Sequence, residues 1–326
     1  MSPLVRALRL AVAVGVLVVV PAGPAAAHVA GGPVPSNYSG VITSISAPMP
    51  GVQVTLSASG DELELRNDSD VEVLVPGYSE EPYLRIGPGG VQRNERSPAT
   101  YLNATVQGDS ALPPQTDTDA DPDWVTLSSS ATFRWHDHRT HWMGTVLPPA
   151  VQADPGNTHL ISSWQVPLSY GGESVLINGT LTWTPPPSSL QWTVLAVALG
   201  VSAVAVAGRT RWQRPMLGLL VTLVGVEILH LVLTPTARDS PVFGVVAGSL
   251  PTVAALRLTW GSWRSVRAGT STVGYVAGIA AWLVLVQALP DLDVLWNSQL
   301  PAAGPDWLTR LAVTVAVGLG TGVGLG

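Results

Sequence analysis

The sequence predicts an all-β ectodomain followed by an all-α membrane domain of about five helices. Up to about residue 186, short alternating segments rich in β-branched residues are separated by turn residues, which is typical of strands. After that point, five apolar segments each approach the roughly 20 residues that cross a bilayer. Charged residues make up only 12% of the 326, about half the usual globular share. Much of the chain is therefore expected to avoid water.

The first 27 residues are typical of an export signal. A positively charged start precedes an apolar run at 10–20, and the segment ends at Ala27 in a small-x-small pattern. Cleavage after Ala27 makes His28 the first residue of the mature protein. The alternative interpretation is an uncleaved anchor helix.

Residues 28–186 are predicted to form an extracytoplasmic domain. The predicted strands cover residues 40–47, 51–59, 62–67, 70–75, 123–138, 159–168 and 173–183. Seven or more short strands without a convincing helix favour an antiparallel sandwich, immunoglobulin-like or cupredoxin-like. Residues 77–103 are predicted to form a solvated hairpin, and residues 108–123 a solvated loop.

Residues 187–326 are predicted to form the membrane domain. Its predicted spans are about 190–207, 215–233, 242–259, 270–289 and 307–325. The loop at 208–214 carries three Arg, and Arg264 and Arg267 follow the third span. The other loops hold Arg238 and the four Asp of this domain: Asp239, Asp291, Asp293 and Asp306. This bias follows the positive-inside rule. It predicts a multi-pass plasma-membrane protein with an extracytoplasmic N-terminal domain and a cytoplasmic C-terminus.

Composition also excludes several classes of function. The net charge is −6, and the 16 basic residues are all Arg without a basic run, which argues against a nucleic-acid partner. The chain has no Cys, so disulfides and thiolate metal ligands are excluded. No motif typical of hydrolases or nucleotide-binding proteins is present.

Three of the six histidines lie in the stretch RWHDHRTHWMG: His136, His138 and His141. Residues i and i+2 of a strand share one face about 6.6 Å apart, so His136 and His138 are expected to converge on one ion. His141 has the opposite parity and joins them only if the chain turns after Arg139. The alternative is that these are ordinary hydrogen-bonded strand histidines.

A mature N-terminal His28 would add ligands to this cluster. An α-amino group has a pKa of about 7.7–8.0, so a metal easily displaces its proton. The amine and the His28 ring can chelate one ion, and a strand histidine completes a T-shaped set of three nitrogens. Tetragonal nitrogen coordination favours Cu(II). Zinc, which prefers a tetrahedral arrangement, is the runner-up.

An N-terminal His followed by strands and the motif W-H-x-H resembles the amino-terminal cupredoxin domain of the particulate methane and ammonia monooxygenase B subunit. It resembles more loosely the periplasmic copper-resistance proteins that are fused to membrane domains. The resemblance implies copper ligands at His28, His136 and His138. It covers only the two ends of the ectodomain, and five predicted spans stand where that subunit has two.

The second predicted span contains Glu227 and His230, which share one helical face at i and i+3. Ionisable groups inside a bilayer are costly and usually functional. The pair is interpreted as a possible intramembrane polar site, a relay that passes a proton or metal ion from the ectodomain side. The alternative is a polar pair satisfied within the bundle.

The function that the sequence favours is a membrane-anchored extracytoplasmic copper-binding protein for copper sequestration, delivery or uptake. Its expected partners are membrane lipid and another copper protein or membrane complex. Two alternatives stay open. One is an ectodomain with a structural or protein-interaction role and no metal. The other is a mononuclear copper oxidase or monooxygenase component, although the sequence shows neither an open ligand position nor a reductant, so a role without catalysis is favoured.

Overall fold

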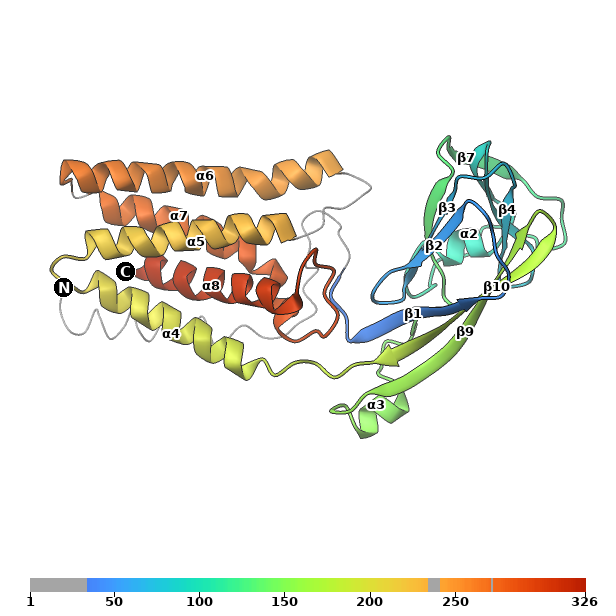
Figure 1. Cartoon of the computed structure of the whole chain (residues 1–326), viewed down its shortest axis with the longest axis horizontal. Helices are drawn as coiled ribbons and strands as arrows, with labels where there is room; N and C mark the ends of the chain where they lie inside the picture. The colour runs from blue at the N-terminus through green and yellow to red at the C-terminus, as the bar shows by residue number, and fades with distance from the viewer. Residues whose placement is uncertain (1–33, 234–240, 271) are drawn as a thin grey trace. The chain divides into compact units, whose positions relative to one another are not determined.

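The computed structural model describes residues 34–233, 241–270 and 272–326. Within these residues the chain forms a β unit, Ser36–Pro185, and a helical unit that begins at Pro186 (Figure 1). The predicted signal segment and His28 lie outside the described residues, so their predictions are not tested.

The β unit contains two antiparallel sheets. Its strands are β1 (Tyr38–Ile45), β2 (Val52–Leu56), β3 (Glu62–Asn67), β4 (Val73–Pro76), β5 (Pro82–Gly87), β6 (Gly90–Asn94), β7 (Trp124–Ser128), β8 (Thr132–His136), β9 (His159–Tyr170) and β10 (Glu173–Trp183). The larger sheet has the order β1-β10-β9-β4-β5-β6-β7, and the smaller one β2-β3-β8. Two short helices, α2 (Ala99–Leu102) and α3 (Pro149–Ala153), lie in the connections. The predicted antiparallel sandwich is confirmed.

Both sheets contribute alternate residues to one core. On β3, Leu63 and Leu65 are fully buried, whereas Glu62 and Glu64 on the opposite face are partly exposed. The larger sheet supplies most of the remaining core side chains: Val73, Val75, Leu84, Ile86, Val91, Trp164, Val166, Leu168, Val175, Ile177 and Leu181. This period of two is what a half-buried strand requires. Because the unit has its own core, it is expected to fold without the helices.

Two local predictions in the β unit are wrong. Residues 123–138 do not form one strand, because bends at 129–131 divide them into β7 and β8, which belong to different sheets. Residues 77–103 do contain a hairpin, β5–β6, but it lies inside the larger sheet with Leu84, Ile86 and Val91 fully buried. It is therefore not a solvated hairpin. The loop at 108–123 contains no helix or strand and is largely exposed, as predicted.

The helical unit has five α-helices in its described residues, the predicted number. They are α4 (Leu190–Ala207), α5 (Gln213–Leu233), α6 (Pro241–Ala268), α7 (Val273–Ala288) and α8 (Asp306–Leu325), with the 3₁₀ helix η1 (Pro290–Leu295) after α7. Three of them, α4, α5 and α8, are long and apolar enough to cross a membrane. Helix α7 is apolar but has only 16 residues. Most of α8 is buried, and it packs against α4, α5 and α7.

Helix α6 is longer than the predicted third span. Its 28 residues extend to Ala268, so Arg264 and Arg267 lie on the helix and not in a loop. Trp260 and Trp263 pack together near this end, with ring centroids 4.8 Å apart, and the Arg267 guanidinium lies 4.8 Å from the Trp263 ring. Aromatic and basic side chains together are typical of a membrane–water interface. The apolar run ends near residue 259, as predicted, but the helix continues to Ala268.

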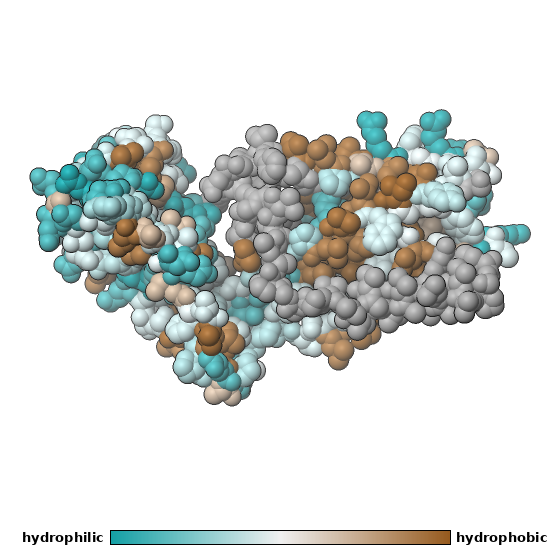
Figure 2. Space-filling view, turned by 180° about the vertical axis from the view of Figure 1, so that it is seen from behind, coloured by the Kyte–Doolittle hydropathy of each residue, from teal (hydrophilic) through white to brown (hydrophobic). Residues whose placement is uncertain are grey.

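The surface of the helical unit is rich in apolar side chains, which gather over several helices in Figure 2. Val232 on α5 is 71% exposed and Tyr275 on α7 is 82% exposed. Other exposed apolar residues on helices α4 to α7 are Val194, Val221, Leu250, Val253, Leu256, Ile279 and Val286. Such a surface is unfavourable in water and favourable in lipid. The helices are therefore compatible with a membrane protein.

Candidate metal site at the end of strand β8

A buried turn follows β8 directly. The side chain of Asp137 is fully buried and accepts a hydrogen bond from the Trp135 indole N–H at 3.0 Å. The Arg139 guanidinium donates to both carboxylate oxygens of Asp137 at 2.7 Å. The Arg139 backbone N–H also donates to Asp137 Oδ1, at 3.2 Å, which is the pattern of an Asx turn. The strand therefore ends at His136, and the predicted alternation does not reach His138.

This turn brings two of the three clustered histidines together. The Thr140 N–H donates to the Asp137 carbonyl at 3.0 Å, and its buried hydroxyl lies 2.6 Å from the Gly60 carbonyl oxygen. The chain then returns so that His138 and His141 meet edge to face, with ring centroids 5.4 Å apart and planes at 83°. The sequence required a turn after Arg139 for His141 to join the other two histidines. The turn lies at residues 138–140, and it brings His141 to His138.

The His138 ring is held by contacts on two sides. Its Nε2–H donates to the Thr105 carbonyl at 2.9 Å, and the ring stacks on Tyr78 with centroids 5.8 Å apart. Because a carbonyl only accepts, Nε2 carries the proton and Nδ1 of the neutral ring keeps its lone pair. Gly108, at φ +66°, lies beside this nitrogen, and a Cβ there would be 2.8 Å from Nδ1. The His138 ring is therefore packed closely against Gly108, and a side chain at this position would displace it.

The His141 ring is more enclosed. Its Nε2 atom is buried and has no hydrogen-bond partner among the residues that the structure describes. Burial lowers the pKa of the imidazole below its ordinary value, and charge repulsion from His138 and His136 acts in the same direction. A buried nitrogen that stays neutral and unpaired costs free energy unless it meets a partner. That unsatisfied nitrogen fits a metal ligand.

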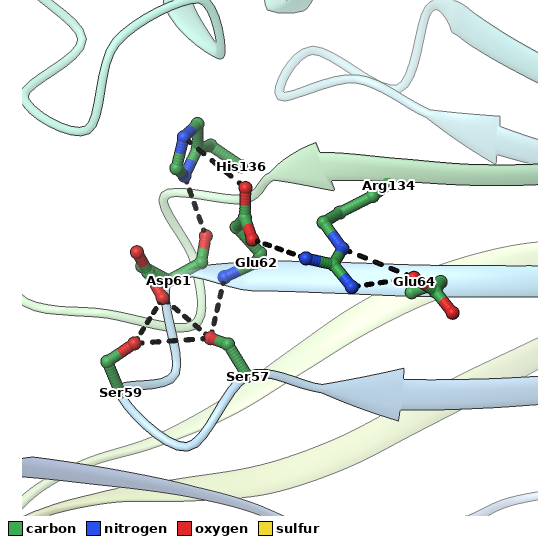
Figure 3. A network of polar contacts seen from close by, with 7 residues as sticks. All are labelled: Ser57, Ser59, Asp61, Glu62, Glu64, Arg134 and His136. Carbon is green, nitrogen blue, oxygen red and sulfur yellow. Dashed lines mark hydrogen bonds and ion pairs between the residues drawn. The ribbon is translucent and has the colours of Figure 1, made fainter. Parts of the chain in front are cut away.

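His136 points to a different set of partners (Figure 3). Its Nδ1–H donates to the Asp61 carbonyl at 3.2 Å, and its Nε2 lies 3.8 Å from the Glu62 carboxylate. A carbonyl bond at one ring nitrogen is the usual way to orient the other for a metal. Here the other nitrogen faces Glu62, which also contacts Arg134 at 3.3 Å.

The sequence analysis did not predict the polar groups around His136, which include Asp61 and its partners Ser57 and Ser59. Burial alone would raise the pKa of the Asp61 carboxyl, but hydrogen bonds from Ser57 and Ser59 outweigh burial and leave that pKa below its ordinary value. Arg134 also donates to Glu64, at 2.7 Å, across the β3–β8 pair. The alternation of acidic and apolar residues on β3 shows which residues face outward. That alternation does not show that β8 pairs with β3.

The structure therefore pairs His138 with His141 and directs His136 towards Glu62. Among residues 34–233, 241–270 and 272–326, no three His, Asp or Glu side chains are arranged to hold a metal ion. His159, the other histidine of the β unit, is bonded through Nε2 to the Asp154 carbonyl at 2.6 Å. His28, the further ligand predicted from the sequence, lies outside the described residues.

The predicted intramembrane pair does face each other. On α5, Glu227 is 1% exposed and His230 is 4% exposed. The His230 Nδ1 atom lies 4.0 Å from a Glu227 carboxylate oxygen. A third group, Asp291 of η1, lies 3.5 Å from His230 Nε2. Asp291 was predicted only as part of an outer loop.

Comparison with known proteins adds no relative to this picture. No family model, no curated protein and no solved structure matches the chain. The resemblance to the monooxygenase domain therefore stays a prediction from the motif.

We expect acid to destabilise the β unit through His141. Its folded pKa lies below the ordinary 6.5, so the folded state binds fewer protons than the unfolded state as the pH falls through that value. Stability is therefore expected to fall between about pH 7 and about pH 5, the range in which histidine titrates. The measurement is the urea midpoint of residues 36–185 against pH.

The His141→Gln variant is expected to lose part of this slope, and His159→Gln is the matched control that keeps it. If His141→Gln and the parent show the same slope, burial of His141 does not contribute to acid sensitivity.

Proposed function

We propose that the protein is a membrane-anchored extracytoplasmic copper-binding protein for copper sequestration, delivery or uptake. The observation that carries the proposal is the edge-to-face pair of His138 and His141. His141 has a buried nitrogen without a partner among the described residues, and His138 keeps a lone pair on Nδ1 when its Nε2–H donates to the Thr105 carbonyl. Both features fit nitrogen atoms that can bind a metal ion.

Copper is the favoured ion because the available donors are imidazoles and no Cys is present. Nitrogen donors suit Cu(II), which also heads the divalent affinity series. Zinc is the competing ion, and it would require a tetrahedral set. His28, as a mature N-terminus, would supply an amine and a ring nitrogen, and His136 would add a further imidazole. Bound there, the ion is stored or passed on.

The location follows from the predicted topology. Export of the β unit and the Arg-rich loop at 208–214 put the β unit outside the plasma membrane and the C-terminus in the cytoplasm. The expected partners are membrane lipid around the helices and another copper protein or membrane complex that gives or takes the ion. A cupredoxin-like classification of the sandwich belongs to the same proposal.

A non-metal role for the ectodomain has one observation in its favour. One nitrogen each of His136 and His138 already donates to a backbone carbonyl, as expected for structural histidines. The same bonds also fix the tautomer of metal-bound histidines. Binding data therefore decide between the two roles.

The test is Cu(II) binding to residues 28–186 with His28 as the free N-terminus. Calorimetry gives the stoichiometry, and electron paramagnetic resonance gives the ligand type. We expect one-to-one binding with a nitrogen-rich axial spectrum. Binding should weaken by more than about 10-fold in His138→Gln and His141→Gln, and also when one extra residue precedes His28. His136→Gln reports whether that ring is a ligand.

His159→Gln is the matched control, because it removes an imidazole outside the cluster. Circular dichroism of each variant shows whether the fold persists. Equal, weak binding by the parent and all folded variants would contradict the copper proposal and favour the interaction role. Tight binding of zinc with no preference for copper would correct the choice of metal.

A further inference from the structure

Three ionisable side chains lie in a row inside the helical unit, and none of them belongs to the β8 site. Glu227 and His230 lie on α5, and Asp291 lies on η1, where the chain has left α7. The side chains of Glu227, His230 and Asp291 are 1%, 6% and 15% exposed. Buried charges are costly unless they are paired or functional, and the cost is larger in a bilayer.

The arrangement places a different carboxylate at each ring nitrogen of His230. Nδ1 lies 4.0 Å from Glu227 Oε2, and Nε2 lies 3.5 Å from Asp291 Oδ2. A metal ion would need a ring nitrogen and carboxylates converging on one point. Here the two carboxylates lie at opposite ends of one imidazole. That order suits a proton, because imidazole can accept a proton at one nitrogen while it releases another.

Glu227 is the last of the three groups. Both of its carboxylate oxygens are buried and have no hydrogen bond within the described residues, and the nearest ion-pair contact is the 4.0 Å one to His230. A carboxylate in this setting is unfavourable, and a carboxylic acid is much less so. The Glu227 carboxyl group is therefore suited to hold a proton.

We propose that Glu227, His230 and Asp291 form a proton relay between the η1 end of the helical unit and the buried Glu227 carboxylate. This site is independent of the copper proposal.

The transfer conserves charge and protons. Protonated Asp291 gives its proton to His230 Nε2 and becomes a carboxylate. The Nδ1–H of the same imidazole passes its proton to the Glu227 carboxylate, which becomes an acid. The ring stays neutral overall, with its tautomer exchanged. Both distances exceed the roughly 2.6–3.2 Å of direct transfer, so a small side-chain rotation or one bridging water completes each step.

The neighbouring charges support exchange at the η1 end. Burial raises the pKa of Asp291 to about 7, and the charge of Asp293 acts in the same direction. Helix α8, which packs on η1, carries Arg310 and Asp306, and Arg310 donates to the Val294 and Asn297 carbonyls. His230 and Asp291 also make further polar interactions. Asp291 can therefore gain and lose a proton near neutral pH.

The other helices against α5 contribute few charges. Helices α4 and α7 contain no Asp, Glu, Arg or His. Helix α6 carries its three Arg in its C-terminal half, at Arg257, Arg264 and Arg267. In a titration, the signal of Glu227 therefore has to be distinguished from the effects of the η1 carboxylates and of the Arg and Asp on α8.

The test is infrared difference spectroscopy of the full chain in lipid nanodiscs while the pH is stepped. We expect a carboxylic-acid C=O band that disappears in Glu227→Gln and a second one that disappears in Asp291→Asn. His230→Gln keeps both carboxyl groups but breaks the link, so the midpoint of the Glu227 band should move by about one pH unit or more. Asp306→Asn, at a more exposed carboxylate, is the control that should leave both bands.

Two results would overturn the relay. In the first, folded Glu227→Gln gives the spectrum of the parent, which means that Glu227 does not exchange a proton. In the second, stoichiometric Zn²⁺ or Cu²⁺ abolishes both bands at constant pH, which identifies a metal site in place of the relay. Circular dichroism and size-exclusion elution of each variant establish that it is folded, and the near-isosteric Gln and Asn substitutions favour this.

Discussion

Replacing Asp137 with alanine is expected to destabilise the β unit by about 3 kcal/mol, a large part of the roughly 5–15 kcal/mol that stabilises a typical domain. Asp137 is fully buried and accepts three side-chain hydrogen bonds, one from the Trp135 indole and two from Nε and Nη2 of Arg139. Its removal leaves the Arg139 charge, with a side chain only 20% exposed, without the carboxylate that pairs with it directly. We choose the low end of the range for broken buried ion pairs because of that remaining exposure. The measurement is urea unfolding of residues 36–185 followed by tryptophan fluorescence.

Two further variants separate the charge from other causes. Asp68→Ala removes a partner of Arg66 in a pair whose side chains are 58% and 53% exposed, and it should cost less than about 1 kcal/mol. The double variant Asp137→Ala, Arg139→Leu removes both charges and should regain part of the lost stability. If it is no more stable than Asp137→Ala alone, the unpaired Arg139 charge is not the main cost.

The Asp137 turn also orients the proposed copper ligands. It ends β8 and returns the chain so that His141 reaches His138. Asp137→Asn keeps an acceptor for the turn and loses the charge, so a folded variant allows the two effects to be compared. We expect its copper affinity to fall along with its stability, since the two rings depend on the same hydrogen bonds.

The sequence predicted those features that depend on local periodicity. The alternation on β3, with Leu63 and Leu65 inward and Glu62 and Glu64 outward, is present in the structure. The helices of the helical unit lie where the apolar runs predict them, although α6 continues beyond its run. The hairpin β5–β6 was predicted as a pair of strands but with the wrong burial, because its polar residues gave no indication of the sheets on either side.

The features that were missed depend on contacts between distant parts of the chain. Arg134 and Glu64 are 70 residues apart, and only the pairing of β3 with β8 brings them together. The division of 123–138 into two strands depends on which sheet each half joins. In the helical unit, Asp291 of η1 lies 3.5 Å from His230 of α5, and the apolar pattern of α7 does not indicate that contact.

Replacing Gly322 with alanine is expected to destabilise the helical unit by about 1–3 kcal/mol. Gly318 and Gly322, one turn apart on α8, lie directly against α4. A Cβ at Gly322 would be 2.5 Å from the Gly200 carbonyl oxygen, and one at Gly318 would be 2.6 Å from the Ala196 carbonyl oxygen. In lipid, helices associate through close packing of small residues, so a methyl group at this contact forces the two backbones apart. The measurement is thermal unfolding of the full chain in detergent micelles by circular dichroism.

Gly225→Ala on α5 is the matched control, because the same methyl group there has no atom of the described residues within 4 Å. Alanine is favoured over glycine inside a helix by about 1 kcal/mol. The two variants gain the same helix propensity, and only Gly322→Ala meets a neighbouring backbone, so the two shifts in melting temperature should have opposite signs. Two shifts of the same sign would mean that α4 and α8 can separate at little cost, and that the glycines of α8 do not determine how these helices pack.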